Sequence, residues 1–175
     1  MSTPTLIIYA TTDGHTQKIA GVIRDTLESM DHEVDVRNVL EEPVDLTGYD
    51  KIIVGSSIRY GYHHKSIVKW IDAHAEELSQ RKNAFFSVNL VARKSEKCTP
   101  ETNPYVRKFL AKIKWKPQLS AVFAGKLDYN IYNWFDAFMI RLIMRMTGGP
   151  LETPEPIEFT DWEQVKKFAE EVGRL

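Results

Sequence analysis

The chain has 175 residues, of which 43% are hydrophobic and 27% are charged, and its formal net charge is −1. These values are typical of one compact globular domain, and they exclude a disordered chain and a strongly basic protein that binds nucleic acid. The single cysteine, Cys98, excludes an internal disulfide and fits a reducing compartment, and no cluster of metal ligands surrounds it in the sequence.

The N-terminal segment has no basic stretch followed by a long apolar run, so we expect no secretory signal. No apolar run reaches the roughly 18 residues that would span a bilayer. We therefore expect a cytoplasmic protein, and any contact with a membrane should be peripheral. No metal site is expected.

Short apolar runs alternate with amphipathic segments along the chain. Residues 5–10, 51–56, 84–90 and 120–125 are nearly continuous apolar runs, which are typical of strands buried on both faces of a parallel sheet. Residues 33–39 alternate instead, and this pattern predicts an edge strand with one face in solvent.

The segments between these strands predict helices. The apolar stripes of the first two helices consist of Ile19, Val22, Ile23, Leu27 and Met30, and of Ile67, Ile71 and Leu78. The third helix should begin at Pro104, with Asn103 as its N-cap. The last helix should begin with a capping box formed by Thr160 and Glu163.

Because strands and helices alternate, the pattern predicts one α/β domain over residues 1–175, with helices on both faces of an open parallel sheet. Right-handed crossovers then bring the ligand site to the carboxyl ends of the strands. The site should therefore be built from the loops that follow the first, third and fourth strands.

The first of these loops reads TTDGHT, from Thr11 to Thr16, and it joins the first strand to the first helix. Free N–H groups at a helix start, together with hydroxyl groups, favour a phosphate. The loop has neither the lysine of a Walker loop nor three glycines, so it suits one terminal phosphate. A turn that only caps the helix explains this hexamer equally well.

This loop resembles the phosphate loop of flavodoxins. Thr11, Gly14 and Thr16 match the family pattern, and Asp13 stands where the family usually has a hydroxyl. The resemblance implies a flavodoxin-like, doubly wound, five-stranded parallel sheet of order 2-1-3-4-5 that binds FMN. Asp13 either caps the helix from outside or weakens the affinity for FMN, and both interpretations stay open.

The same resemblance implies that the loops at residues 55–64 and 87–97 hold the isoalloxazine ring. The cofactor-binding residues expected are Thr11, Thr12, Asp13, Gly14, His15, Thr16, Ser57, Ile58, Arg59, Tyr60, Gly61, Ser87, Val88, Asn89 and Leu90. No catalytic side chain is assigned, because a flavin carries the redox chemistry itself. His63 and His64, adjacent at a helix start, are expected to face solvent.

An insertion at about residues 127–154 interrupts the last strand, and it contains an apolar and basic helix at residues 134–146. One side of this helix carries Trp134, Arg141 and Arg145, and the opposite side carries Phe135, Phe138, Met139, Leu142, Ile143 and Met146. Leaving that apolar side in water would cost about 10 kcal/mol. We therefore expect it to be covered by the core, by a second subunit in a homo-oligomer, or by lipid.

Four stretches, GSSIRYG, FFSVNLVARK, WFDAFMIRLIMRMTGG and TDWEQV, resemble the family of bacterial menaquinone-dependent protoporphyrinogen IX dehydrogenases. The resemblance implies an FMN enzyme of heme biosynthesis that oxidises protoporphyrinogen IX to protoporphyrin IX. Its electrons would pass to menaquinone or another respiratory quinone at the cytoplasmic face of the inner membrane.

Basic and aromatic side chains near the ring loops are the candidates for binding the substrate and its propionates, and they are Arg59, Tyr62, Arg93 and Lys94. The candidates for contact with membrane and quinone are Trp134, Phe135, Phe138, Met139, Arg141, Leu142 and Arg145. Two alternative functions are a flavodoxin-type electron carrier, which the near-neutral charge disfavours, and an NAD(P)H:quinone oxidoreductase.

Overall fold

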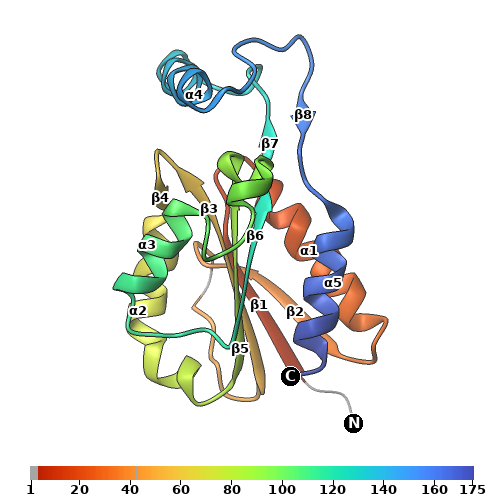
Figure 1. The fold of residues 1–175 in the computed structure, drawn as a ribbon. Helices are drawn as coiled ribbons and strands as arrows, with labels where there is room; N and C mark the ends of the chain where they lie inside the picture. The colour runs from red at the N-terminus through yellow and green to blue at the C-terminus, as the bar shows by residue number, and fades with distance from the viewer. Residues whose placement is uncertain (1–3, 42) are drawn as a thin grey trace.

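A computed structural model describes residues 4–41 and 43–175 of the chain, which form a parallel sheet between two layers of helices (Figure 1). The sheet has the order β2-β1-β3-β5-β6, and all four neighbouring pairs are parallel. Its strands are β1 (Pro4–Ala10), β2 (Glu33–Asn38), β3 (Lys51–Arg59), β5 (Lys82–Asn89) and β6 (Leu119–Ala124). This order confirms the predicted doubly wound sheet, because these five strands follow the order 2-1-3-4-5 along the chain.

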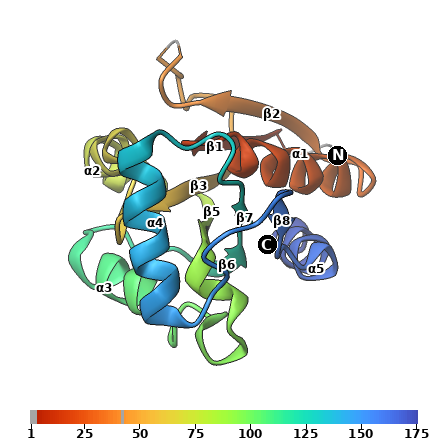
Figure 2. The ribbon, with the colours of Figure 1, turned by 90° about the horizontal axis from the view of Figure 1, so that it is seen from above.

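Helices α1 (His15–Glu28) and α5 (Trp162–Gly173) cover one face of the sheet, and α2 (Lys65–Ser79) and α3 (Pro104–Lys112) cover the other (Figures 1 and 2). Successive strand residues alternate between the two faces. Ile7 therefore packs with the α1 and α5 side, and Ile8 packs with the α2 and α3 side. Two-sided burial explains why the strands are continuous apolar runs in the sequence.

The start of α3 is as the sequence predicts, and the start of α5 differs from the prediction. The Asn103 side chain accepts a hydrogen bond from the Val106 N–H, as an N-cap should. The predicted capping box at α5 is wrong, because the N-cap is Asp161, whose carboxylate accepts from the N–H groups of Glu163 and Gln164. The Thr160 hydroxyl instead donates to the carbonyl of Ala124, and so it fixes the end of β6.

A short hairpin extends β3 at its carboxyl end. Strand β4 (Tyr62–His63) pairs antiparallel with the end of β3, and the turn consists of Tyr60 and Gly61, with φ angles of 53° and 81°. Two successive positive φ angles are the signature of a type I′ turn. Tyrosine is unusual in this conformation, and such residues cluster at functional sites.

The insertion stands on a two-stranded stalk above the carboxyl ends of the parallel strands (Figure 1). Strands β7 (Lys126–Leu127) and β8 (Ile157–Glu158) pair antiparallel with each other and form a separate small sheet. Between them, α4 (Trp134–Thr147) crosses over the carboxyl end of the main sheet (Figure 2). It ends at Gly148, which is left-handed with φ 67°, as the GGP stretch predicts.

Candidate functional site

A pocket lies where the loops after β1, β3, β5 and β6 meet the inner side of α4. The loop after β1 and the turn after β3 line it with Thr11, Thr12, Asp13, His15, Thr16, Ser57, Ile58, Arg59, Tyr60 and Gly61. The remaining walls come from Val88, Asn89, Leu90, Val91, Tyr105, Gly125, Lys126, Asp128, Ile131, Tyr132, Ile140, Ile143 and Met144. The crevice rule for parallel sheets correctly gives this location.

The loop from Thr11 to Thr16 is shaped to hold an anion. Gly14 is the N-cap of α1 with a φ of 86°, and its N–H donates to the Thr11 hydroxyl at 2.9 Å. The hydroxyl groups of Thr12 and Ser57, 3.2 Å apart, join this loop to β3. A Cβ added at Gly14 would meet nothing within 4 Å, so the backbone there is open to a ligand. The first N–H groups of α1 have no intrahelical acceptors and can donate to a phosphate.

The cations around this loop are already paired with carboxylates. Lys18 contacts Glu158 at 2.8 Å, and Lys126 contacts Asp128 at 3.5 Å. An anion in the loop must therefore be held mainly by amides, hydroxyls and the helix dipole, as the sequence suggests.

Arg59 explains how a carboxylate is tolerated in the phosphate loop. Its guanidinium forms an ion pair with Asp13 and a second one, at 3.4 Å, with Asp136 of α4. The same guanidinium lies over the ring of Tyr132, 5.5 Å from its centre. Asp13 is thus neutralised from the side of β3, and Arg59 links the phosphate loop to the insertion. Tyr60 also donates a hydrogen bond to Asp136.

His15 lies at the start of α1, against α5 and the stalk. Its Nε2 is 2.6 Å from the Thr160 hydroxyl, which itself donates to the Ala124 carbonyl. Thr160 must therefore accept the hydrogen from Nε2, which leaves Nδ1 without a proton in the neutral ring. Burial lowers the pKa of His15, and nearby Lys18 and Lys126 lower it further against the opposing effect of Glu158.

A buried chain of hydrogen bonds supports the loop after β5. His63 Nε2 is 2.9 Å from the Ser87 hydroxyl, to which the Asn89 amide also donates. Asn89 in turn accepts hydrogen bonds from Ala92 and Asn103. The Asn89 side chain, expected among the cofactor-binding residues, is thus engaged in holding its own loop.

The expectation that His63 faces solvent is wrong, because its ring is buried between Phe85 and Phe109. This burial lowers the pKa of His63 to about 3. His64 caps α2 instead, and its Nδ1 accepts from the Ser66 N–H.

Arg93 fastens the C-terminal end of α4 to the loop after β5. Its guanidinium donates to the carbonyl of Leu90 at 2.9 Å and to the carbonyl and hydroxyl of Thr147 at 3.1 and 3.0 Å. A Cβ on Gly149 would lie 2.3 Å from Met144 Sδ and 2.6 Å from Arg93 Nη2, so a larger residue there would displace both side chains. Together with Arg59 at the N-terminal end, Arg93 clamps α4 to both loops that flank the pocket.

The inner and outer sides of α4 differ sharply. Ala137, Ile140 and Met144 are buried, and the last two form a small cluster with Leu127 of the stalk. The predicted apolar side is largely exposed in the single chain, with Phe138 60% and Met146 79% accessible. Apart from the contacts of its two ends with Arg59, Tyr60 and Arg93, the helix packs on the molecule through its buried side chains, because it lies across a pocket and not on a packed layer.

The sequence identifies most of this pocket. Every residue expected on the three flavin loops lines it, apart from Gly14, which caps α1, and Ser87, which is buried behind it. Among the side chains assigned to the substrate, Arg59 lines the pocket, whereas Tyr62 is 70% exposed outside it, and Arg93 and Lys94 are not in its lining. Trp134, Phe135, Phe138, Arg141, Leu142 and Arg145 are exposed on α4, and Met139 is half-buried.

Sequence reasoning missed the wall built from residues 125–132 and from Tyr105. These residues follow β6 and begin α3, and the loop after the fifth strand was not among those considered. The rule that ligands bind at strand carboxyl ends applies to that loop as well, and could have found it. Within the described residues, no three His, Cys, Asp or Glu side chains are grouped so that they could hold a metal ion.

Comparisons with known proteins agree with this geometry. The family model for the flavodoxin domain matches residues 6–153. Among solved structures, a flavodoxin from the domain Archaea has a TM-score of 0.56 at 16% identity, covering 98% of this chain and 96% of that one. Oxidised Flavodoxin 1 from Bacillus cereus has a TM-score of 0.57 at 17% identity, covering 98% of both chains. The fold and the strand-end pocket are those of a flavodoxin-type protein.

Curated relatives place the chain in a narrower group within the flavodoxin-type proteins. The protoporphyrinogen IX dehydrogenase [quinone] of Escherichia coli is 47% identical over 173 residues, which cover 98% of this chain and 95% of the relative. The protein of the same name from Leishmania major is 42% identical over 97% of this chain and 74% of its own. The chain belongs to the flavodoxin superfamily and, within it, to the protoporphyrinogen IX dehydrogenase [quinone] family.

Proposed function

We propose that the chain is an FMN-dependent enzyme that oxidises protoporphyrinogen IX to protoporphyrin IX and passes the electrons to a quinone. The observation that carries this proposal is the 47% identity to a protoporphyrinogen IX dehydrogenase [quinone] over 98% of the chain, a span that includes the insertion above the pocket.

The residues present fit FMN. The loop Thr11–Thr16 would hold its phosphate, and the ring would lie between the segments 58–61 and 88–90. When bound, FMN supplies two-electron chemistry, so three turnovers would remove six electrons and six hydrogens and convert three quinones to quinols. The chain itself positions the reactants, and Ile140 and Met144 of α4 exclude water from above.

A cation in the pocket wall is suited to a carboxylate of the substrate. Lys126 lines the pocket and is near Asp128, a carboxylate that it can exchange for a propionate, whereas Arg59 is needed to neutralise Asp13. Lys94 is not in this lining and serves as the matched control. We expect Lys126→Gln to raise KM for protoporphyrinogen several-fold, whereas Lys94→Gln should leave KM near that of the wild type. Equal effects of the two substitutions would contradict this assignment.

The exposed outer side of α4 supports a peripheral contact with the membrane that contains the quinone. Trp134 is 83% exposed at the start of the helix, followed by Phe135, Phe138 and Leu142. Amphipathic helices with such a face lie in the bilayer interface. No helix of the described residues has both the length and the apolarity needed to cross a bilayer. On this proposal the chain works at the cytoplasmic face of the inner membrane with menaquinone or a related quinone.

The decisive experiment mixes purified protein with FMN and removes oxygen. Protoporphyrinogen IX should then bleach the flavin absorbance, and adding a soluble quinone analogue should restore it while porphyrin fluorescence accumulates. NAD(P)H in place of protoporphyrinogen is the control. Bleaching by NAD(P)H alone would replace the proposal with an NAD(P)H:quinone oxidoreductase, and bleaching by neither donor would support an electron carrier.

A further inference from the structure

We propose that the outer side of α4 is a docking surface for anionic phospholipid in particular, and that the charge of the protein orients it there. This inference rests on the membrane contact proposed above and names the lipid class that it requires. The docking surface consists of four exposed apolar side chains and two exposed arginines of α4. The apolar side chains are Trp134, Phe135, Phe138 and Leu142, and the arginines are Arg141 and Arg145.

The docking surface combines an apolar face with a basic edge. At about 100° per residue, Phe138 and Leu142 follow Trp134 at about 40° and 80°, so they lie next to the side that carries Arg141 and Arg145 and not opposite it, where the sequence predicted them. Both arginines are exposed, and no salt bridge formed by the described residues involves either one. Arg141 donates through Nε to the Leu151 carbonyl at 3.2 Å and lies over the ring of Tyr129. Apolar side chains flanked by arginines match an interface with acyl chains on one side and headgroup phosphates on the other.

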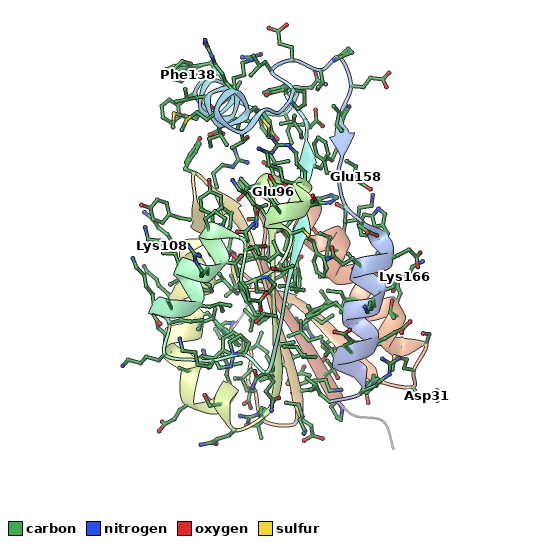
Figure 3. All side chains as sticks on the ribbon, in the orientation of Figure 1. Asp31, Glu96, Lys108, Phe138, Glu158 and Lys166 are labelled. Carbon is green, nitrogen blue, oxygen red and sulfur yellow. The ribbon has the colours of Figure 1, made fainter. Side chains whose placement is uncertain are left out.

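The side of the molecule next to α4 is also basic. Residues 102–127 hold six lysines and arginines and no aspartate or glutamate, although Lys114 and Lys116 lie before the start of β6, at the end of the sheet away from α4. Arg107, Lys108 and Lys112 are exposed on α3, and Tyr105 at its start faces the same pocket as the inner side of α4. Figure 3 shows Lys108 on the same side of the molecule as Phe138, whereas Asp31 and Lys166 lie on the opposite side.

The cations on this side of the molecule are those of α4 and α3. Arg141 and Arg145 are exposed on α4, and Arg107 and Lys108 are exposed on α3. An anionic surface attracts these side chains, so it favours the approach of the protein with α4 toward the bilayer.

The contacts of α4 keep the docking surface turned outward. Arg59 and Tyr60 contact Asp136 in the first turn of α4, and Arg93 contacts Thr147 in its last turn. Ile140 is buried on the side of the helix that faces the pocket. Rotating the helix to bury Phe138 would break all of these contacts. The apolar face is thus presented to a partner and is not available to the core of its own chain.

Charge also favours lipid over a second copy of the chain. A twofold contact through α4 would bring two identical basic sides together, and like charges in an interface are repulsive. An anionic bilayer offers the opposite sign over a flat surface.

The test is flotation of the FMN-loaded protein with vesicles of phosphatidylcholine, with or without phosphatidylglycerol. We expect about tenfold tighter binding to the anionic vesicles, and this preference should fade as salt is raised. Arg141→Gln/Arg145→Gln should abolish the preference, whereas the matched control Lys166→Gln/Lys167→Gln on α5 should keep it. Phe138→Ser should weaken binding to both kinds of vesicle.

Three outcomes would overturn the inference: equal binding to both vesicles, an unchanged preference in the arginine variant, or a concentration-dependent dimer in sedimentation that Phe138→Ser dissociates. A second measurement, the bleaching of the flavin by protoporphyrinogen in detergent, distinguishes a failure of the docking inference from a failure of the proposed function. If bleaching persists without the lipid preference, only the docking inference fails, and if vesicles bind without bleaching, only the enzymatic proposal fails.

Discussion

Arg59 is the side chain on which the carboxylates of Asp13 and Asp136 converge. In the phosphate loop, Asp13 would repel a phosphate if it were left unpaired, so the guanidinium makes the loop acceptable to an anion. The sequence alone left two interpretations of Asp13 open. The N-cap of α1 is Gly14, without a side-chain cap, so Asp13 does not cap the helix. Because Asp13 pairs with Arg59, we expect that it does not weaken the affinity for FMN. The ion pair also shows why a carboxylate can replace a hydroxyl at this position.

A double-mutant cycle tests this role. We expect Arg59→Gln to raise the Kd for FMN about tenfold or more, since it leaves the Asp13 carboxylate uncompensated beside the phosphate. The double variant Asp13→Asn/Arg59→Gln should recover most of the lost affinity. Quenching of FMN fluorescence measures both. Additive losses would show that the two side chains act separately.

His63 makes the stability of the fold depend on pH. Its pKa is about 3 in the folded protein because the ring is buried, against an ordinary value near 6.5 in the unfolded chain. Between these values the unfolded chain binds the additional proton, so the stability is fully present above pH about 6.5 and is lost as pH falls toward 3. The slope that His63 adds is at most about 1.4 kcal/mol per pH unit.

The variant His63→Gln keeps a partner for Ser87 and removes the titration. We expect its free energy of unfolding to fall less than that of the wild type between about pH 6.5 and 5, where few carboxylates titrate. Urea unfolding at several pH values measures the difference. Parallel curves for the two proteins would mean that the pKa of His63 is the same in the folded and the unfolded chain, and would contradict this prediction.

Among the elements, α4 depends on side chains from outside the helix. The Arg93 guanidinium donates to Thr147 in the last turn, where helix carbonyls lack partners. It reaches this position because η1 (Leu90–Arg93) turns the chain directly after β5. The insertion is therefore built onto the flavin loops and does not hang freely from the stalk.

Removing that contact should loosen one end of α4. We expect Arg93→Met to speed amide hydrogen exchange in residues 143–149 by roughly tenfold, because a lost bond to a half-buried carbonyl costs about 1–3 kcal/mol. The exposed Arg107→Met on α3 is the matched control and should leave this exchange unchanged. Equal protection in both variants would mean that packing alone holds the helix end.

The sequence predicts well those elements that one physical factor determines. Burial on both faces of the sheet determines the strand formed by residues 51–56, and the preference of Asn103 and Pro104 for a helix start determines where α3 begins. The capping box at Thr160 failed because Asp161 offers a stronger acceptor while Thr160 serves β6 and His15. Likewise, periodicity could not predict which side of α4 is buried, because apolar residues occur around most of the helix. Contacts with residues far away in the sequence determine that Ala137, Ile140 and Met144 are the buried ones.

At the scale of the whole molecule, the insertion is separate from the core. The two large apolar clusters fill the two faces of the main sheet, whereas Ile140 and Met144 join a third, small cluster with Leu127. In the stalk, β7 pairs with β8 and neither strand joins the main sheet, so the main sheet is complete without α4. Stability should therefore reside in the sheet and the four helices that cover it.

Replacing residues 129–150 with a short glycine-serine linker tests this separation. We expect cooperative unfolding with little change in midpoint, because neither large cluster loses a member. FMN should still bind through its phosphate, with lower affinity, and vesicle binding and reduction of membrane quinone should be lost. Circular dichroism and FMN titration give the first two results. An uncooperative transition would show that α4 belongs to the folding unit.

The two-ended attachment of α4 also links events that occur on opposite sides of the helix. Each loop beside the pocket holds one end of the helix, through Arg59 or through Arg93, so a ligand that shifts either loop changes how the outer surface is presented. With the membrane contact proposed above, thermodynamic reciprocity requires that the bilayer alter the affinity for that ligand by the same factor by which the ligand alters the affinity for the bilayer. Membrane composition would in this way tune cofactor and substrate occupancy without touching either molecule.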